Sequence, residues 1–513
     1  MAALKRLSLA LLVPAALVSC ATPGQRSGDA FPAGEVGRVF AVGYQSITER
    51  YVDPVDIGTV AFEGLSGLST LDSGISVARN GDLVELRGPD GVLAKLDAPD
   101  DADAAGWAKL TAIALDAGRA GSPHLEYAST ERLYQVVFEG ALSRLDGFSR
   151  YTGAEEALEQ RAAREGFGGI GIRFALAGDG VQVTAVLPDS PAARADIQAD
   201  DLITHVDGAP VAGLDHRAVA RRLRGRVDSR VELTLARTGL EGSLKLTLAR
   251  KLIIPTTVEA RLEGDLAYLR VIGFNQRTTT QVSDAFSQLK QEAEIAGVVL
   301  DLRDNPGGLL DQAVAVADLF LSRGRILSTI GRHPDSNQEF DATDDDIANG
   351  LPMAVLINGQ SASAAEIVAA ALQDHGRALV IGSTSFGKGT VQNVIRLPNN
   401  GELILTWSRM HAPSGQVLHE LGVAPTICTS NPQTSAPGAV DDLLRGAAEP
   451  GSTLALSRGD QGRDRETSEE LRRVCPSRHS MPEADLEVTR KLLGDAELYA
   501  RALQLSFPAV ATR

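Results

Sequence analysis

Ser363 and Lys388 are the residues whose types and surroundings could do chemistry. Ser363 precedes an apolar run at 364–372, which predicts a buried helix. A serine at a helix N-terminus has backbone N–H groups and a favourable dipole nearby for a developing oxyanion. Lys388 could take the serine proton if it is neutral, which requires burial among apolar groups and away from acids. No acidic residue lies between positions 378 and 401, so the local sequence permits such a lysine.

Ordinary structural roles also fit each of these residues. Ser363 followed by Glu366 has the spacing of a capping box, in which two side chains satisfy backbone N–H groups at a helix start. Lys388 lies between two glycines, where a lysine is usually a solvated turn residue. Residues 382–388 have the G-x-x-x-x-G-K spacing of a phosphate loop, but Gly389 stands where that loop needs Ser or Thr, and a strand-like run follows. The sequence therefore disfavours a phosphate site.

Three segments in this order, SASAAEI, QDHGRALVIG and SFGKGTVQ, resemble the core of the carboxyl-terminal processing peptidases, a family of tail-specific serine proteases with a Ser–Lys dyad. The resemblance implies that Ser363 is the nucleophile, that Lys388 is the general base and that Gln392 orients the lysine. Ala365 and Ser385 stand where the family usually has Ser and Thr, and neither change removes an essential group.

A glycine pair upstream extends this resemblance. Residues 301–308, DLRDNPGG, match a motif of the family, and backbone N–H groups exposed by a Gly-Gly turn suit an oxyanion hole. The resemblance implies that Gly308 and Ala364 donate to this hole, although the glycines would equally make a tight turn into a helix. Glu366 and Asp374 are expected to support the structure of the site.

Composition indicates a soluble globular protein of about three domains. The chain has 513 residues, of which 43% are hydrophobic and 23% charged, and its net charge is −16. The acidic excess argues against nucleic-acid binding and offers no basic face for anionic lipid. The eight histidines show no metal-binding spacing, and the acidic run at 344–346 lacks the spaced ligands of a calcium loop. We therefore expect no cofactor and no metal.

The N-terminus has the pattern of a secretion signal. Lys5 and Arg6 precede an apolar run at 7–18, which is too short to span a bilayer and ends in Leu-Val-Ser-Cys20. This ending resembles a bacterial lipoprotein signal, which implies cleavage before Cys20, lipidation of that cysteine and a periplasmic protein anchored to a membrane. An ordinary signal peptide is the alternative. Ala21 stands where an inner-membrane retention signal would have Asp, which favours the outer membrane.

The chain divides into segments of different character. Within the helical N-terminal region, short alternating runs at 76–96 predict a three-stranded meander, to which we assign no function. We expect an α/β and α+β multidomain protein with a helical N-terminal region, a PDZ domain, an α/β protease core with ββα-type units and a helical C-terminal tail. The expected boundaries are 1–19 for the signal, 20–33 for a tether, 34–165, 166–252 and 253–430 for the three domains, 431–480 for a linker and 481–513 for the tail.

The segment FGGIGIRF and the later VQVTAVLPDSPAARADIQADDLITHVDGAPV resemble a PDZ domain. Consecutive N–H groups in a glycine-rich turn can capture a terminal carboxylate while the peptide adds as a strand to the sheet edge. The resemblance assigns this role to Gly169, Ile170, Gly171 and Ile172. Asp196 and Asp200 put a side chain at positions where glycine is usual in these turns.

Cys428 and Cys475 are the cysteines that remain besides Cys20. In an oxidising periplasm they could pair and close the C-terminal tail onto the core. The sequence does not give their separation, so their pairing stays open.

Together these patterns predict a periplasmic, lipid-anchored serine endopeptidase. Its PDZ groove would hold the free, apolar C-terminus of a protein or peptide substrate, and Ser363 would cleave the chain that reaches it. The expected partners are such substrates and the membrane through Cys20, with an adaptor protein left open. The alternatives are a catalytically retired PDZ binding scaffold and a hydrolase that uses the same dyad on another bond.

Overall fold

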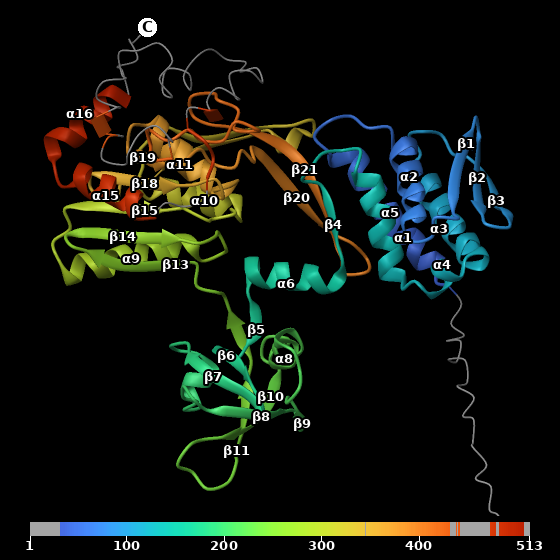
Figure 1. Ribbon diagram of the computed structural model, residues 1–513, viewed down its shortest axis with the longest axis horizontal. Coiled ribbons are helices and arrows are strands. Elements are labelled where there is room, and N and C mark those ends of the chain that lie inside the picture. Colours follow the sequence, from blue (N-terminus) through green and yellow to red (C-terminus); the bar gives the residue numbers. More distant parts are fainter. Residues whose placement is uncertain are drawn as a thin grey trace, which may run out of the picture.

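The computed structural model describes residues 31–343, 345–430, 438, 440–441, 472–473, 475–478 and 482–506. The described residues form three units (Figure 1): an N-terminal helical unit, a small β-domain and a larger α/β core. The helical unit and the core lie at opposite ends of the long axis, and the β-domain extends from the region between them. The predicted signal, Cys20, most of the tether and most of the linker lie outside the described residues.

The N-terminal unit is a helical bundle with a small antiparallel sheet in the order β1-β2-β3. The meander expected at 76–96 is this sheet. Phe40, Tyr44 and Phe138 are fully buried, with ring centroids 5.0–6.4 Å apart, and they join α1 to α5. The elements are α1 (Ala33–Arg50), α2 (Ile57–Ser66), β1 (Ser76–Asn80), β2 (Leu83–Gly88), β3 (Gly91–Asp97), α3 (Ala104–Gly121), α4 (Pro123–Tyr127) and α5 (Thr130–Leu142).

A strand and a helix connect this unit to the rest of the molecule. The strand β4 (Arg150–Thr152) pairs with β21 (Glu402–His411) of the core, and the helix α6 (Ala154–Glu165) follows it. Arg161 and Arg164 of α6 donate to Glu402 at 2.8 and 3.0 Å, and Glu402 is buried. Because this buried carboxylate has two guanidinium partners, its charge is compensated and α6 is held against the core.

The β-domain has a sheet in the order β11-β10-β8-β7-β6, with β9 paired to β8, and β5 pairs with β12 where the chain enters and leaves. Asp196 and Asp200, which replace the usual glycines, have φ values of 57° and 71°. Aspartate tolerates this left-handed conformation better than most residues do, so both turns form without glycine. The elements are β5 (Phe167–Gly169), β6 (Ile172–Ala177), β7 (Gly180–Val186), α7 (Pro191–Arg194), β8 (Leu202–Val206), β9 (Ala209–Pro210), α8 (His216–Leu223), β10 (Arg230–Ala236), β11 (Leu244–Ala249) and β12 (Lys251–Ile253).

The core has a main sheet in the order β13-β14-β15-β18-β19-β22, in which β13 is antiparallel to β14 and the other pairs are parallel. Helices α9, α10 and α11 cover one face of this sheet, and α15 and α16 pack on the other (Figure 1). A second sheet has the order β17-β16-β21-β20. The elements are β13 (Val258–Glu263), β14 (Leu266–Val271), α9 (Thr278–Glu292), β15 (Gly297–Asp301), α10 (Leu310–Asp318), β16 (Arg325–Ile330), β17 (Gln338–Asp341), β18 (Met353–Ile357), α11 (Ala364–Asp374), β19 (Leu379–Gly382), β20 (Thr390–Arg396), β22 (Ile427–Cys428), α15 (Pro482–Leu493) and α16 (Ala496–Ser506).

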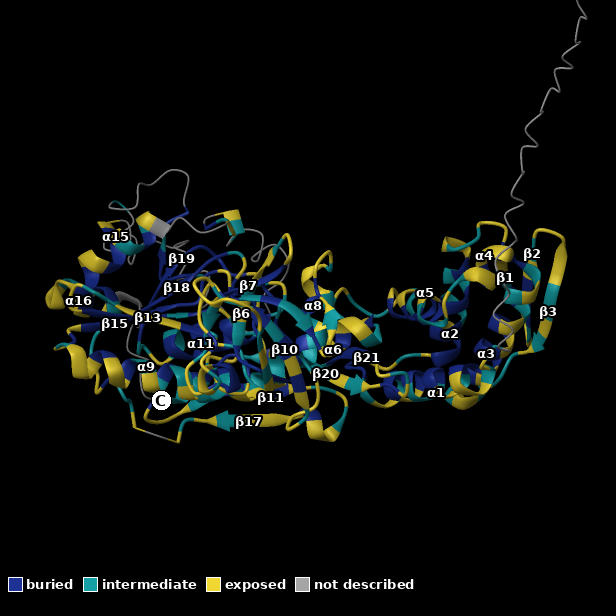
Figure 2. Cartoon of the chain, turned by 90° about the horizontal axis from the view of Figure 1, so that it is seen from below, coloured by how far each residue is buried: buried dark blue, intermediate teal, exposed yellow. Residues whose placement is uncertain are grey.

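The apolar run at 364–372 forms the buried helix that the sequence predicts. Every residue from Ala364 to Leu372 is buried in α11. Figure 2 shows buried residues concentrated in the strands and central helices of the core. Because α11 is enclosed by this packing, the serine at its N-terminus has a fixed position.

A disulfide and two helices attach the C-terminal tail to the core. Cys428 and Cys475 are bonded, with their Cα atoms 5.8 Å apart, so the pairing that the sequence left open is present. In the part of the chain that the structure describes, no helix is long and apolar enough to cross a membrane.

Candidate active site

Ser363 lies at the sharp turn between β18 and α11. Its φ of 54° and ψ of −112° fall in a region that non-glycine residues rarely adopt, and such strain persists only where the surroundings enforce it. The neighbouring Ser361 is fully buried, and its hydroxyl donates to the Leu302 carbonyl at 2.8 Å and accepts from the Asn358 N–H at 2.9 Å. Ser361 therefore shapes the turn, and Ser363 is the serine that the turn presents.

Glu366 connects the serine turn to the lysine loop. Its carboxylate is fully buried and accepts four hydrogen bonds, from Ser363 N at 2.6 Å, Ser385 Oγ at 2.5 Å, Gly387 N at 2.7 Å and Lys388 N at 2.9 Å. Burial raises the pKa of Glu366, and these donors lower it. The sequence predicted only the contact at the helix start, whereas the same carboxylate also fixes the backbone on both sides of Gly387.

Lys388 holds its amine in a half-buried position beside an amide. Its Nζ donates to Gln392 Oε1 at 2.8 Å and lies 5.5 Å from the centroid of the Phe148 ring. Burial, together with the smaller effect of the nearby Arg150 charge, lowers the pKa of Lys388 to about 8. A lysine with this pKa is partly neutral near neutral pH and can accept a proton.

The surroundings of Lys388 are less free of acids than the sequence suggested. Glu366 and Asp146 both raise its pKa by charge, although the desolvation of the amine outweighs them. No hydrogen bond joins the Lys388 amine to the Ser363 hydroxyl or to a carboxylate within the described chain. Such contacts are often long without substrate and tighten when it binds, so this arrangement fits a resting site.

Phe148 covers the amine from the loop that follows α5. Asp146 accepts hydrogen bonds from Phe148 N and Ser149 N, both at 2.6 Å, which fixes this loop. The Gln392 side-chain amide faces the Phe148 carbonyl at 3.5 Å, and the edge of the ring meets His419 with centroids 5.8 Å apart. The ring contributes to the burial of the amine, and burial is the main cause of its lowered pKa.

The Gly307–Gly308 turn is pressed against the serine. A Cβ added at Gly307, which has a φ of 100°, would lie 3.0 Å from Ser363 Cβ and 3.1 Å from Ala364 N. Ala364 is the first residue of α11, so its N–H has no acceptor within the helix. The predicted donors Gly308 and Ala364 thus belong to the two segments that meet at Ser363.

Asn305 holds this turn in place. Its side chain is fully buried, accepts from Gly307 N at 2.9 Å and donates to the Val271 carbonyl at 2.7 Å. Its own carbonyl accepts from Ala362 N at 2.9 Å, next to the serine. Asn305 is not among the site residues predicted from the sequence, although its place within the DLRDNPGG motif was a usable signal.

Asp374 lies at the opposite end of α11 from Ser363, about 15 Å of helix away. Its carboxylate accepts from Ser414 N at 2.9 Å. It therefore contacts a loop rather than the serine turn, and its support of the site stays a prediction.

The β-domain contains a groove between β6 and α8. A cavity of about 340 Å³ is lined by the four residues predicted to bind a peptide, together with apolar, aromatic and basic neighbours. Phe174 and His216 stack across it with centroids 4.4 Å apart, and the Arg224 guanidinium lies 4.1 Å from the centroid of the Phe167 ring. The lining residues are Phe167, Gly169, Ile170, Gly171, Ile172, Arg173, Phe174, His216, Ala220, Leu223, Arg224 and Ile253.

Comparison with known proteins identifies the families of the core and of the β-domain. Residues 265–429 match the model of peptidase family S41, and residues 182–237 match a PDZ domain. A carboxy-terminal-processing protease of Bartonella bacilliformis is 39% identical over 318 residues, which cover 61% of this chain and 73% of that protein. The chain belongs to the carboxy-terminal-processing protease family.

Two further relatives are more distant. A probable CtpA-like serine protease of Staphylococcus epidermidis is 30% identical over 318 residues, which cover 61% of this chain and 64% of the relative. A solved photosystem II D1 C-terminal processing protease is 25% identical, covers 76% of this chain and 92% of its own, and has a TM-score of 0.38.

This carboxy-terminal-processing protease is a serine-type peptidase with a PDZ domain. Among its described residues, no group of three or more His, Cys, Asp or Glu side chains is arranged to hold a metal ion. Sequence reasoning found the motif residues and missed Phe148, which comes from a distant segment. The only signal for it was the LDGFSRYT stretch, which resembles a helix end of the family.

Proposed function

We propose that the protein is a periplasmic, lipid-anchored endopeptidase that holds substrate C-termini in its PDZ groove and cleaves with Ser363 and Lys388. The observation that carries this proposal is the state of the Lys388 amine. It is half-buried under Phe148, bonded to the neutral Gln392 amide, and has a pKa of about 8. These features support a lysine that acts as a base.

The proposed reaction is an acyl transfer in two halves. Neutral Lys388 accepts the Ser363 hydroxyl proton as Oγ bonds to the scissile carbonyl carbon, and the N–H groups of Gly308 and Ala364 stabilise the oxyanion. The C–N bond then breaks, and the lysine ammonium gives its proton to the leaving amine. In the second half, Lys388 takes a proton from water, the water oxygen attacks the acyl carbon, and Ser363 is released with its proton restored.

The rate of this chemistry should follow the protonation of Lys388. Below the pKa the ammonium cannot accept a proton, so labelling of Ser363 by a fluorophosphonate probe should rise with pH around a midpoint near 8. At pH 6 labelling should be about a hundredfold slower than on the plateau. Mass spectrometry of the labelled peptide identifies the serine and gives the rate at each pH.

A matched variant sharpens this test. Gln392→Glu would place a carboxylate beside the amine, at the position of an acceptor now 2.8 Å away, and an adjacent negative charge favours the ammonium. The midpoint should then move upward. A pH-independent rate, an unshifted midpoint in the variant, or a label on another serine would contradict the proposal.

The groove supports the proposed recognition of C-termini. Its lining is mainly apolar, with glycine backbone at one end and basic side chains nearby, which suits an apolar terminal residue and its carboxylate. Ala220→Trp should fill part of the cavity and weaken binding of an apolar-ended peptide by about tenfold or more. Fluorescence anisotropy measures the affinity.

Two controls belong to this groove experiment. The same peptide with an amidated C-terminus should bind wild-type protein poorly, and Ala175→Trp, an exposed position of β6 outside the cavity lining, should bind like wild type. Equal binding of the acid and amide forms would rule out capture of a terminal carboxylate.

The lipid anchor and the periplasmic location rest on residues 1–20 alone, and outer-membrane attachment rests on Ala21. A Cys20→Ser variant that still fractionates with the membrane would contradict the anchor. The involvement of an adaptor protein stays open.

A further inference from the structure

A short part of the C-terminal tail lies across both loops of the active site. We name residues 472–473 and 475–478 the strap. Gly359 N, in the serine turn, donates to the Arg478 carbonyl at 2.9 Å, and Ser383 Oγ donates to the same carbonyl at 3.2 Å. On the lysine loop, Thr384 Oγ1 donates to the Cys475 carbonyl at 2.7 Å. One segment therefore bonds to the chain before Ser363 and to the chain before Lys388.

The strap also packs tightly against glycines of both loops. A Cβ added at Gly359 would lie 2.4 Å from Ser477 Oγ, and one added at Gly387 would lie 3.0 Å from Arg472 Nη2. The Arg472 guanidinium donates to the Phe386 carbonyl at 3.1 Å. The strap is therefore in close contact with both loops.

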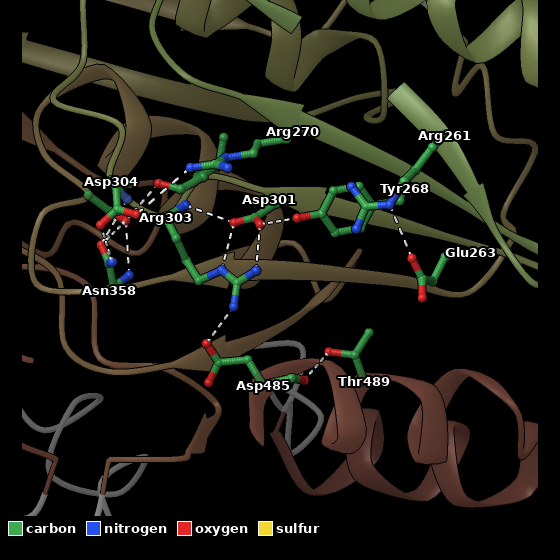
Figure 3. Close-up of polar contacts among 12 residues, drawn as sticks. Arg261, Glu263, Tyr268, Arg270, Asp301, Arg303, Asp304, Asn358, Asp485 and Thr489 are labelled. Atoms are coloured by element: carbon green, nitrogen blue, oxygen red, sulfur yellow. Dashed lines mark hydrogen bonds and ion pairs between the residues drawn. The ribbon is translucent and has the colours of Figure 1, made fainter. Parts of the chain in front are cut away.

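A disulfide and a helix hold the strap in place. Cys475 is fully buried and bonded to Cys428 at the end of β22, which pairs with Gly382 at the start of the lysine loop. Beyond the strap, Asp485 of α15 accepts from Arg303 at 2.8 Å (Figure 3), and Arg303 begins the loop that leads to Gly308. All three loops of the site are therefore tied to the tail.

We propose that the strap is a positioning element of the active site and that the Cys428–Cys475 disulfide keeps it seated, so that reduction of this bond slows catalysis without unfolding the protein. The proposal rests on the proposed function, since it concerns the geometry of Ser363 and Lys388. A dithiol reductant supplies two electrons and two protons, the S–S bond becomes two thiols, and the reductant leaves as a disulfide.

Loss of the link frees the strap to leave the loops, because the cross-link no longer limits the conformations of the tail. The loop that carries Lys388 is then no longer held by the strap, so the amine should become more exposed and its pKa should return toward the ordinary value of 10.5. Two measurable changes in catalysis should follow: kcat should fall, and the acid limb of the pH–rate profile should shift to higher pH. A purely structural disulfide would change the melting temperature and neither of these.

The experiment compares full-length protein in detergent before and after treatment with dithiothreitol. Alkylation and mass spectrometry verify that Cys428 and Cys475 are reduced, and circular dichroism verifies the fold. Peptide cleavage should lose roughly tenfold or more in kcat, with little change in KM, and the midpoint should rise above 8. The Cys428→Ser/Cys475→Ser variant should have the kcat and midpoint of the reduced protein. Dithiothreitol should not change its activity, which excludes an effect at Cys20.

Unchanged kcat and midpoint in verified reduced protein would overturn the role of the strap. This result would be distinct from a failure of the proposed function. If the proposed function were wrong, even the oxidised protein would not cleave peptide and would not be labelled at Ser363. If the double serine variant does not fold, reduction of folded wild-type protein remains a complete test.

A second test avoids the thiols. Gly359→Ala should push Ser477 and the strap away and lower kcat, and adding Ser477→Ala removes the hydroxyl that is in the way and should restore most of it. Gly178→Ala, where an added Cβ meets nothing within 4 Å, is the matched control. A normal rate in Gly359→Ala, or no rescue by Ser477→Ala, would count against the strap.

Discussion

Lys388→Ala protein should keep its fold and lose peptide hydrolysis almost completely, and Ser363→Ala should match it. The lysine amine donates to the neutral Gln392 amide and has a lowered pKa, so it can accept the proton, and the serine supplies the attacking oxygen. Removing one member of a unit costs about as much as removing all of it, so kcat should fall by at least about 10⁴-fold in either variant. Digestion of casein at pH 9 measures the loss.

The stability of a Lys388→Met protein shows whether loss of activity comes from the missing base or from unfolding. In the folded protein the pKa of Lys388 is lowered to about 8 from 10.5, so between these pH values the unfolded chain binds more protons at this residue. Wild-type stability should therefore rise with pH across that window, relative to the methionine variant. Below pH 8 the methionine variant should be the more stable of the two, and above 10.5 the advantage should vanish.

A charge control completes the experiment. Lys388→Arg keeps a cation that cannot become neutral, so this variant should be as inactive as Lys388→Ala. Lys245 is an exposed lysine of β11, and the Lys245→Ala protein should cleave peptide normally. Wild-type rates in Ser363→Ala or Lys388→Ala would refute the assignment of the dyad.

The sequence was informative where function depends on neighbours along the chain. The apolar run at 364–372 predicted a buried helix, and the spacing of Ser363 and Glu366 predicted their contact at its start. Motif matches located the lysine and the glycine turn. These features are encoded within a few residues, so periodicity and spacing are sufficient to find them.

The sequence was uninformative where function depends on contacts between distant segments. Phe148 and Gln392 are 244 residues apart, and no local pattern indicates that both lie beside the Lys388 amine. The disulfide stayed open for the same reason, because spacing along the chain does not give a separation in space. The contacts of Glu366 with residues 19–22 positions later were equally hidden behind its local role as a helix cap.

Glu366→Gln should cause the second-largest loss of activity, because this carboxylate positions the reacting groups and takes no part in the reaction itself. The carboxylate accepts from four donors on two segments, and the glutamine amide replaces one acceptor oxygen by a donor. At least one buried N–H or O–H is then left facing another donor, which should destabilise the fold by roughly 3 kcal/mol. Melting by circular dichroism measures that loss, and Glu497→Gln, an exposed carboxylate in the first turn of α16, is the control.

The expected effect on kcat distinguishes positioning from general support. Because Glu366 bonds to the backbone of both Ser363 and Lys388, a small shift in either loop separates hydroxyl from amine, and kcat should fall about a hundredfold with little change in KM. Ser385→Ala breaks one of the same bonds, so its effect and that of Glu366→Gln should not add in the double variant. Additive losses of kcat, or a destabilised Glu366→Gln protein with normal kcat, would contradict this role. Either result would show that the carboxylate stabilises the fold and does not set the distance between the serine hydroxyl and the lysine amine.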